Sequence, residues 1–109
     1  MKTRIPITQE LEHELNRCRD RTGIPALRLV KMAVLDFIQI CSVDEIAPMS
    51  PEKIHRGDLG RASVRLDLDP ESHEKLKQLA TAAGIPTTEL VRSIVKIRVR
   101  TLNRKISNE

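Results

Sequence analysis

The sequence contains one pattern twice at a fixed offset of 61 residues, and this repeat limits the folds open to the chain more than any other feature. GIPALRLVKMAV at residues 23–34 returns as GIPTTELVRSIV at residues 84–95. Without a gap, positions 4–39 match positions 65–100 by identity at Arg4, Glu10, Leu15, Gly23, Ile24, Pro25, Leu29, Val30 and Val34. We therefore expect two copies of one structural unit.

Each copy begins with a short segment in which apolar and polar residues alternate, KTRIPIT at 2–8 and SVRLDLD at 63–69. Alternation with period two over about seven residues predicts a strand with one buried face. The residues of that face are Thr3, Ile5 and Ile7 in the first copy and Val64, Leu66 and Leu68 in the second. The opposite face carries polar and basic residues and is left to solvent.

Capping signals place a helix after each strand. Thr8 and Asp69 are suitable N-caps, and Pro70 fits the first helical position. Gly23 and Gly84 can adopt the left-handed conformation that ends a helix. The expected buried positions of these first helices are Leu11, Leu15 and Cys18 in one copy and Leu76, Leu79, Ala80 and Ala83 in the other.

A second, more apolar helix is expected to start at Pro25 in the first copy and at Pro86 in the second. Its predicted core positions are Leu29, Val30, Ala33, Val34, Phe37 and Ile38, and then Leu90, Val91, Ile94, Val95 and Val99. In the second copy this helix is expected to end before TLNRKISNE at 101–109.

A strand–helix–helix unit of about 40 residues is too small to bury a core alone, and its strand lacks a partner. The sequence therefore predicts a mostly α fold in which two units share a two-stranded antiparallel β-ribbon. Residues 1–42 and 62–109 are the units, and 43–61 form a connector rich in Pro and Gly, in which SPEKI can form one helical turn. Pairing between two chains remains open, but the tether favours pairing within one chain.

Charge and composition narrow the classes of partner. Lys and Arg minus Asp and Glu give +2 over 1–43 (seven and five), −2 over 44–60 (two and four) and +4 over 61–109 (ten and six). Two basic blocks are compatible with nucleic acid. Phe37 is the only aromatic residue, which disfavours binding of single strands by stacking.

No apolar run reaches the roughly 18 residues of a membrane span, and we expect a cytoplasmic, nucleoid-associated protein.

Both copies resemble the ribbon–helix–helix DNA-binding proteins of the Arc/MetJ/CopG superfamily. The resemblance rests on MKTRIPITQELEHEL and on SVRLDLDPESHEKLKQLATAAGIPTTELVRSIV, and it covers nearly all of 1–42 and 62–102. It implies a single-chain tandem pseudo-dimer whose ribbon enters the major groove of duplex DNA. The groove is about 12 Å wide and admits such a ribbon.

The resemblance also implies which residues touch DNA. The outward strand residues would read bases, and they are Lys2, Arg4, Pro6 and Thr8, with Ser63, Arg65 and Asp67. Arg4 and Arg65 are the strongest candidates, because a guanidinium can grip guanine O6 and N7. The start of each second helix would anchor a DNA phosphate, at Ala26 and Leu27 and at Thr87 and Thr88.

The two outward faces differ in chemistry, since Lys2-Arg4-Pro6 stands against Ser63-Arg65-Asp67. Pro6 removes an N–H from the ribbon and Asp67 brings a carboxylate toward DNA. We hypothesise that the preferred half-sites differ, so that the operator is asymmetric. A clean palindrome from binding selections with a lone monomer would contradict this.

Other polar residues allow simpler interpretations. Cys18 and Cys41 lack metal spacing and are expected to be buried apolar side chains. His13, His55 and His73 are expected to face solvent without binding metal. The basic run KIRVRTLNRK at 96–105 is either a solvated helix face or a contact to phosphate or to a neighbouring molecule on DNA.

The leading functional prediction is a repressor or autoregulator, such as a plasmid-type regulator, that binds double-stranded DNA as a pseudo-dimer or homodimer and can line up with further copies on DNA. The alternatives are a relaxosome or plasmid-maintenance accessory protein, an antitoxin, and a protein-interaction module without DNA binding. No carboxylate pair, glycine-rich phosphate loop or nucleophile–base set indicates an enzyme. No cofactor and no small-molecule site are expected.

Overall fold

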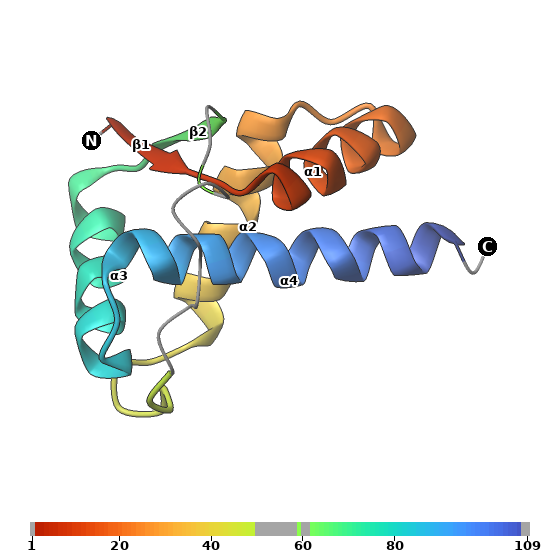
Figure 1. Ribbon diagram of the computed structural model, residues 1–109. Helices are drawn as coiled ribbons and strands as arrows, with labels where there is room; N and C mark the ends of the chain where they lie inside the picture. Colours follow the sequence, from red (N-terminus) through yellow and green to blue (C-terminus); the bar gives the residue numbers. More distant parts are fainter. Residues whose placement is uncertain (1, 50–58, 60–61, 108–109) are drawn as a thin grey trace.

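The computed structural model describes residues 2–49, 59 and 62–107 (Figure 1). Its elements are β1 (Lys2–Pro6), α1 (Gln9–Thr22), α2 (Ala26–Ile40), β2 (Ser63–Asp67), α3 (Pro70–Ala83) and α4 (Thr87–Ser107). The order strand, helix, helix thus occurs twice. Each element of the second unit starts 61 residues after its counterpart, at 63, 70 and 87 against 2, 9 and 26.

Strands β1 and β2 pair antiparallel within the chain, with Arg4 directly opposite Arg65. The predicted class, mostly helical with a two-stranded antiparallel sheet, is confirmed for the described residues. Each strand is two residues shorter than expected. Beyond β1, the Ile7 N–H donates to the Ala62 carbonyl at 3.1 Å, and Thr8 then serves as a helix cap instead of a strand residue.

The predicted helix caps are confirmed at both ends of α1 and α3. The Thr8 hydroxyl accepts from the Leu11 N–H at 3.1 Å. The Asp69 carboxylate accepts from the Ser72 N–H at 3.1 Å. Hydrogen bonding to the Ser72 side chain, and then to its backbone N–H, lowers the pKa of Asp69. Gly23 and Gly84 end these helices with φ of 75° and 76°, in the left-handed region where a side chain is strained.

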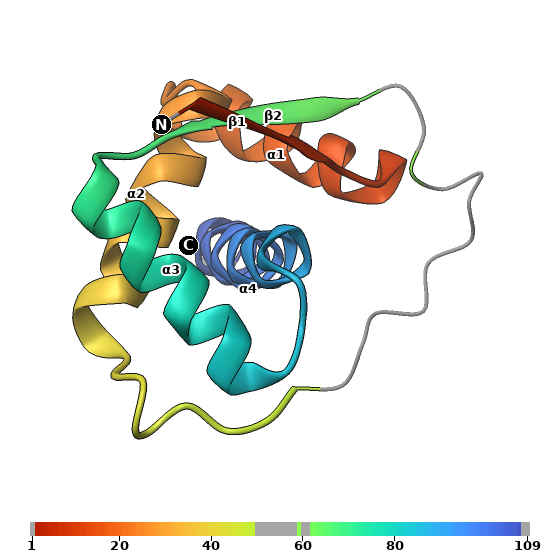
Figure 2. The ribbon, with the colours of Figure 1, turned by 90° about the vertical axis from the view of Figure 1, so that its left-hand side faces the viewer.

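One hydrophobic cluster joins the inner face of the ribbon to the facing sides of all four described helices. Looking along α4, Figure 2 shows this helix in the centre with the ribbon above it. The expected core positions are buried, except that Thr3 and Phe37 are only half-buried. Helix α1 packs mainly on α4 of the other unit, less on α2 of its own. Neither unit therefore closes its core by itself.

Helix α4 runs to Ser107, so the prediction that it ends before residue 101 is wrong. The extra turns are held by contacts to distant parts of the chain. Leu102 packs against the core, and the Asn103 side-chain amide donates to the Glu14 carbonyl of α1 at 3.3 Å. The sequence pattern near residue 100 does not reveal these partners, since they lie almost 90 residues away.

The described start of the connector is anchored to the second unit. Ser42–Ile46 forms a turn, and the Met49 N–H donates to the Ala83 carbonyl at the end of α3 at 2.9 Å. The helical turn expected at SPEKI, residues 50–54, and His55 lie outside the described residues. Among the helices that the structure describes, none has the length and apolar character to cross a membrane.

Candidate nucleic-acid interface

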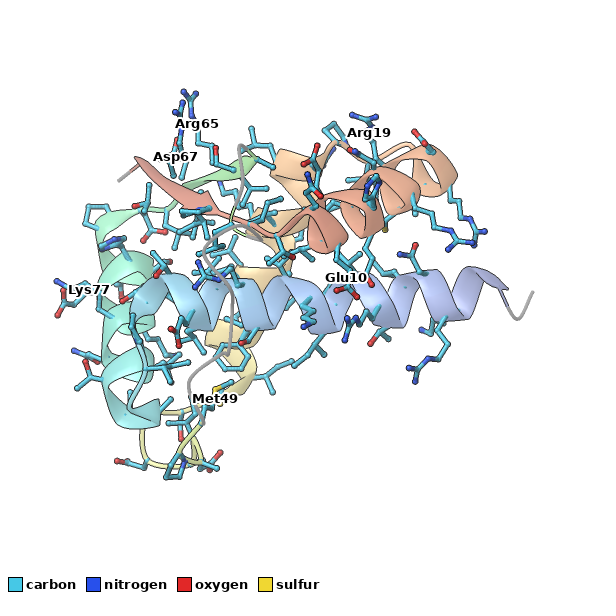
Figure 3. All side chains as sticks on the ribbon, viewed as in Figure 1. Glu10, Arg19, Met49, Arg65, Asp67 and Lys77 are labelled. Carbon is cyan, nitrogen blue, oxygen red and sulfur yellow. The ribbon has the colours of Figure 1, made fainter. Side chains whose placement is uncertain are left out.

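The outer face of the ribbon is formed by alternate residues of both strands. Arg4, Pro6, Ser63, Arg65 and Asp67 are exposed there, while the residues between them are buried or half-buried. Figure 3 shows Arg65 and Asp67 pointing away from the helices. Lys2 belongs to β1 at the position opposite Asp67. Six of the seven predicted base-reading positions therefore lie in the ribbon.

Thr8, the seventh, lies outside the strand. It is half-buried, and its hydroxyl is engaged as the N-cap of α1. Its counterpart Asp69 has the same role for α3. We assign Thr8 to helix capping, because the chain turns from the ribbon into the helix at this residue.

Two arginines meet at the centre of the ribbon. Arg4 and Arg65 are direct cross-strand neighbours, and they are also counterparts in the sequence repeat. In this register, equivalent positions of the two copies face each other at the centre of the ribbon. Like charges placed directly opposite each other destabilise a ribbon. In the free protein the repulsion between the two arginines lowers the stability of the fold. A polyanion bound above the ribbon would neutralise their positive charge.

The predicted phosphate anchors lie at the starts of α2 and α4, and each of these two helix starts borders a hollow beside the ribbon. The α4 hollow is lined from β1 by Thr3, from α3 by His73 and Lys77, and from α4 by Thr87 and Thr88. Backbone N–H groups at a helix start have no partner within the helix and attract anions. Basic and hydroxyl side chains surround that helix start.

The α2 hollow is the repeat counterpart of the first but has different chemistry. It is lined by Glu12 and Asn16 of α1, by Ala26 of α2 and by Ser63 of β2. Glu12 stands where the α4 hollow has His73, Asn16 where it has Lys77, and Ala26 where it has Thr87. Leu27, the other predicted anchor, is exposed and does not line this hollow.

The basic run at 96–105 is partly used inside the molecule. Arg98 is ion-paired with Asp36 of α2. Arg100 bonds to Glu10 at 3.1 Å and to Glu14 at 3.3 Å, both on α1 (Glu10 is labelled in Figure 3). Arg104 and Lys105 are exposed near the C-terminal end of α4. Arg98 and Arg100 thus connect helices, and this favours a structural role for that part of the run.

Sequence reasoning missed Arg92. This residue of α4 is 7% exposed, and its Nη1 donates to the Pro6 carbonyl at 3.2 Å. Its repeat counterpart, Lys31, is exposed. The residue type gives no sign of burial, so only the three-dimensional contact identifies Arg92 as a support of the ribbon.

An apolar groove between α2 and α4 was also missed. Phe37, Ile40, Ile94 and Ile97 line it, and Ile40 and Ile97 are 82% and 66% exposed. Met49 also lines it and lies on the opposite side of the molecule from Arg65 in Figure 3. The groove is therefore separate from the outer face of the ribbon.

The remaining candidates from the sequence are the cysteines and histidines. Cys18 is buried, and burial raises the pKa of its thiol, although Thr22 partly opposes this. Cys41 is half-buried, His13 is exposed and His73 is half-buried beside the α4 hollow. Within residues 2–49, 59 and 62–107, His, Cys, Asp and Glu side chains form no group of three suited to a metal ion.

Comparison with protein-family models, with curated proteins and with solved structures gives no match to this chain.

Proposed function

We propose that this chain is a sequence-specific double-stranded DNA-binding protein that inserts its ribbon into the major groove. In this proposal the two units form a single-chain ribbon–helix–helix pseudo-dimer that acts as a transcriptional repressor or autoregulator. The observation that carries the proposal is the Arg4–Arg65 pair at the centre of an exposed ribbon face. An arginine fork matches guanine O6 and N7, and the major groove has room for two strands.

Three further features support a duplex over other nucleic acids. A two-stranded ribbon presents its outer face as a narrow ridge, which suits a groove. The net charge of the chain is +4. The single aromatic residue, Phe37, lines the apolar groove between α2 and α4, on the other side of the molecule. Stacking platforms for single strands are thus lacking on the outer ribbon residues, which are arginine, serine, proline and aspartate.

The proposal is tested by selection from a random-sequence duplex library, followed by fluorescence anisotropy on the selected duplex at two salt concentrations. The wild type should prefer that duplex to a scrambled one. Arg4→Ala/Arg65→Ala should lose at least about 30-fold in affinity, since each arginine–guanine contact contributes roughly 1–3 kcal/mol of discrimination.

The matched control is Arg104→Ala/Lys105→Ala, which removes the same charge from exposed positions at the far end of α4. It should weaken binding to both duplexes similarly and keep the preference. A ribbon variant that binds like the wild type, or a wild type that binds no duplex at low salt, would overturn the proposal.

A further inference from the structure

The apolar groove between α2 and α4 gathers most of the exposed apolar side chains that the structure describes. Ile40 of α2 and Ile97 of α4 line it. Met32, eight residues before Ile40, lies on the same side of α2 and is also exposed. Among the described residues, only Leu27 and Val43 are large, apolar and exposed elsewhere. Single exposed apolar residues are ordinary on a protein surface, whereas a group of them indicates a contact.

The groove joins equivalent parts of the two units. Four positions of α2 line it, and the repeat counterpart of each, 61 residues later, lines it from α4; the pairs are Ala33 and Ile94, Asp36 and Ile97, Phe37 and Arg98, and Ile40 and Thr101. Met49 also lines the groove and lies on the opposite side of the molecule from Arg65 (Figure 3). A partner in the groove would therefore leave the outer face of the ribbon free.

The described lining of the groove has no net charge, although the chain as a whole carries +4. Asp36 and Arg98 are the charged members of this lining, and they form an ion pair between the two helices. Their side chains remain 47% and 41% exposed. A polyanion is not attracted to such a face, and a second copy of this basic chain is not repelled there.

The Asp36–Arg98 pair makes the groove complementary to a second copy of itself. Two copies that face each other across the groove can be related by a two-fold axis perpendicular to the line from Asp36 to Arg98. That axis exchanges the two positions, so each carboxylate faces the guanidinium of the other copy, as in an isologous interface. Each charge thus keeps its partner within the chain and gains a second opposite charge.

The apolar residues suit the same arrangement. The groove has a volume of about 300 Å3, whereas an apolar cavity of about 150 Å3 already holds benzene. Aliphatic side chains of a facing copy therefore have room to enter. Ile40 and Ile97 are the exposed side chains beside the groove that would do so. Their burial removes apolar surface from water, which favours association.

We propose that two copies of this chain pair back to back through the groove between α2 and α4, so that their ribbons point away from each other and hold two duplex segments at once. The pairing rests on the groove, and the bridging rests in addition on the proposed function.

The expected pairing is weak for free protein. Met32, Ile40 and Ile97 are few, since a stable interface takes roughly 20–30 residues from each partner. Below its dissociation constant, such association has little effect on folding stability. Two copies bound to one DNA molecule have a much higher effective concentration, and this favours their pairing.

Sedimentation velocity of the intact chain without DNA tests the pairing. The wild type should shift from monomer toward dimer as its concentration is raised to about 1 mM, where weak complexes form. Ile40→Gln/Ile97→Gln should weaken association at least about tenfold, because two aliphatic side chains leave the contact. The matched control is Val43→Gln, at an exposed apolar position outside the groove, and it should associate like the wild type. Circular dichroism checks that the helices remain.

Exchanged charges identify the facing molecule as a second copy. In Asp36→Arg and in Arg98→Asp, like charges face each other between identical copies, so each variant alone should stay monomeric. An equimolar mixture of the two should associate, because opposite charges then face each other across the groove. A wild type that stays monomeric, or a mixture that associates no better than its components, would overturn the pairing.

Bridging is measured with the selected duplex immobilised on beads and a fluorescent copy of the same duplex in solution. The wild type should retain the fluorescent duplex on the beads. Ile40→Gln/Ile97→Gln should bind the immobilised duplex but retain at least about fivefold less of the fluorescent one. Equal retention by the two proteins would overturn bridging through the groove. Dimerisation of a wild type that binds no duplex would overturn the proposed function and leave the pairing intact.

Discussion

At the scale of single residues, Arg4 and Arg65 face each other across the two strands of the ribbon. Both are exposed, and their cross-strand position brings like charges together. A threonine would suit an exposed strand position better, since β-branched residues favour strands. An arginine pair here fits the proposed DNA contact better than a purely structural role.

A stability measurement distinguishes these roles at Arg65. Arg65→Thr should raise the free energy of unfolding slightly, by up to about 1 kcal/mol, because it relieves the repulsion with Arg4. The same substitution should lose preference for the selected duplex. Urea unfolding followed by circular dichroism measures the first effect. Destabilisation of more than about 1 kcal/mol would show that Arg65 has a structural role instead.

The Asp69 cap predicts a pH effect with a definite sign. Hydrogen bonds from the Ser72 side chain and from its backbone N–H lower the carboxyl pKa in the folded chain, so their stabilisation is present above the ordinary aspartate pKa of about 3.9. That stabilisation is lost as the pH falls through the lowered pKa. Asp69→Asn keeps a capping oxygen without this titration.

The wild type should therefore lose stability relative to Asp69→Asn as the pH drops below about 4. The measurement is the difference in unfolding free energy between the two proteins from pH 6 to pH 3, which cancels the titration of other groups. A difference that stays constant over that range would mean that the Asp69 carboxylate does not bond its helix end in solution.

At the scale of elements, α4 links the parts of the fold, while α2 packs on β2. Helix α4 contacts β1 and each of the other helices. Arg92 reaches from α4 to the Pro6 carbonyl, where Pro6 itself provides no N–H to the ribbon. The end of β1 is thereby fixed to the central helix, so the position of the outer ribbon face depends on a buried side chain.

The repeat provides a matched pair for testing this support. Arg92→Met leaves the Pro6 carbonyl without its guanidinium donor and should cost about 1–3 kcal/mol of unfolding free energy. Lys31→Met, at the exposed counterpart position, should change it by less than about 0.5 kcal/mol. Equal losses at the two positions would contradict the supporting role of Arg92.

The predictable parts of the fold are those with local signals. Thr8, Asp69, Gly23 and Gly84 mark their helix ends by residue type, and alternation marks both strands. The last turns of α4 were not predictable, since Asn103 gains its partner from α1. The set of side chains that line each hollow could not be predicted for the same reason, because residues from separate elements meet there only after folding.

At the scale of the whole molecule, the two units share one core, and their strands pair within the chain. This arrangement predicts a monomer that unfolds in one cooperative step. Its melting temperature should not change over a hundredfold range of protein concentration, because no second chain is needed for folding. Differential scanning calorimetry measures this, and a melting temperature that rises with concentration would indicate pairing between chains.

The proposal that the ribbon contacts bases in the major groove can be tested by replacing guanine N7 with carbon. Each guanine of the selected duplex would be substituted in turn by 7-deazaguanine, which removes an acceptor only in the major groove. Binding should fall about fivefold or more at guanines contacted by Arg4 or Arg65, and should stay unchanged at flanking guanines. Unchanged affinity at every guanine would contradict the claim.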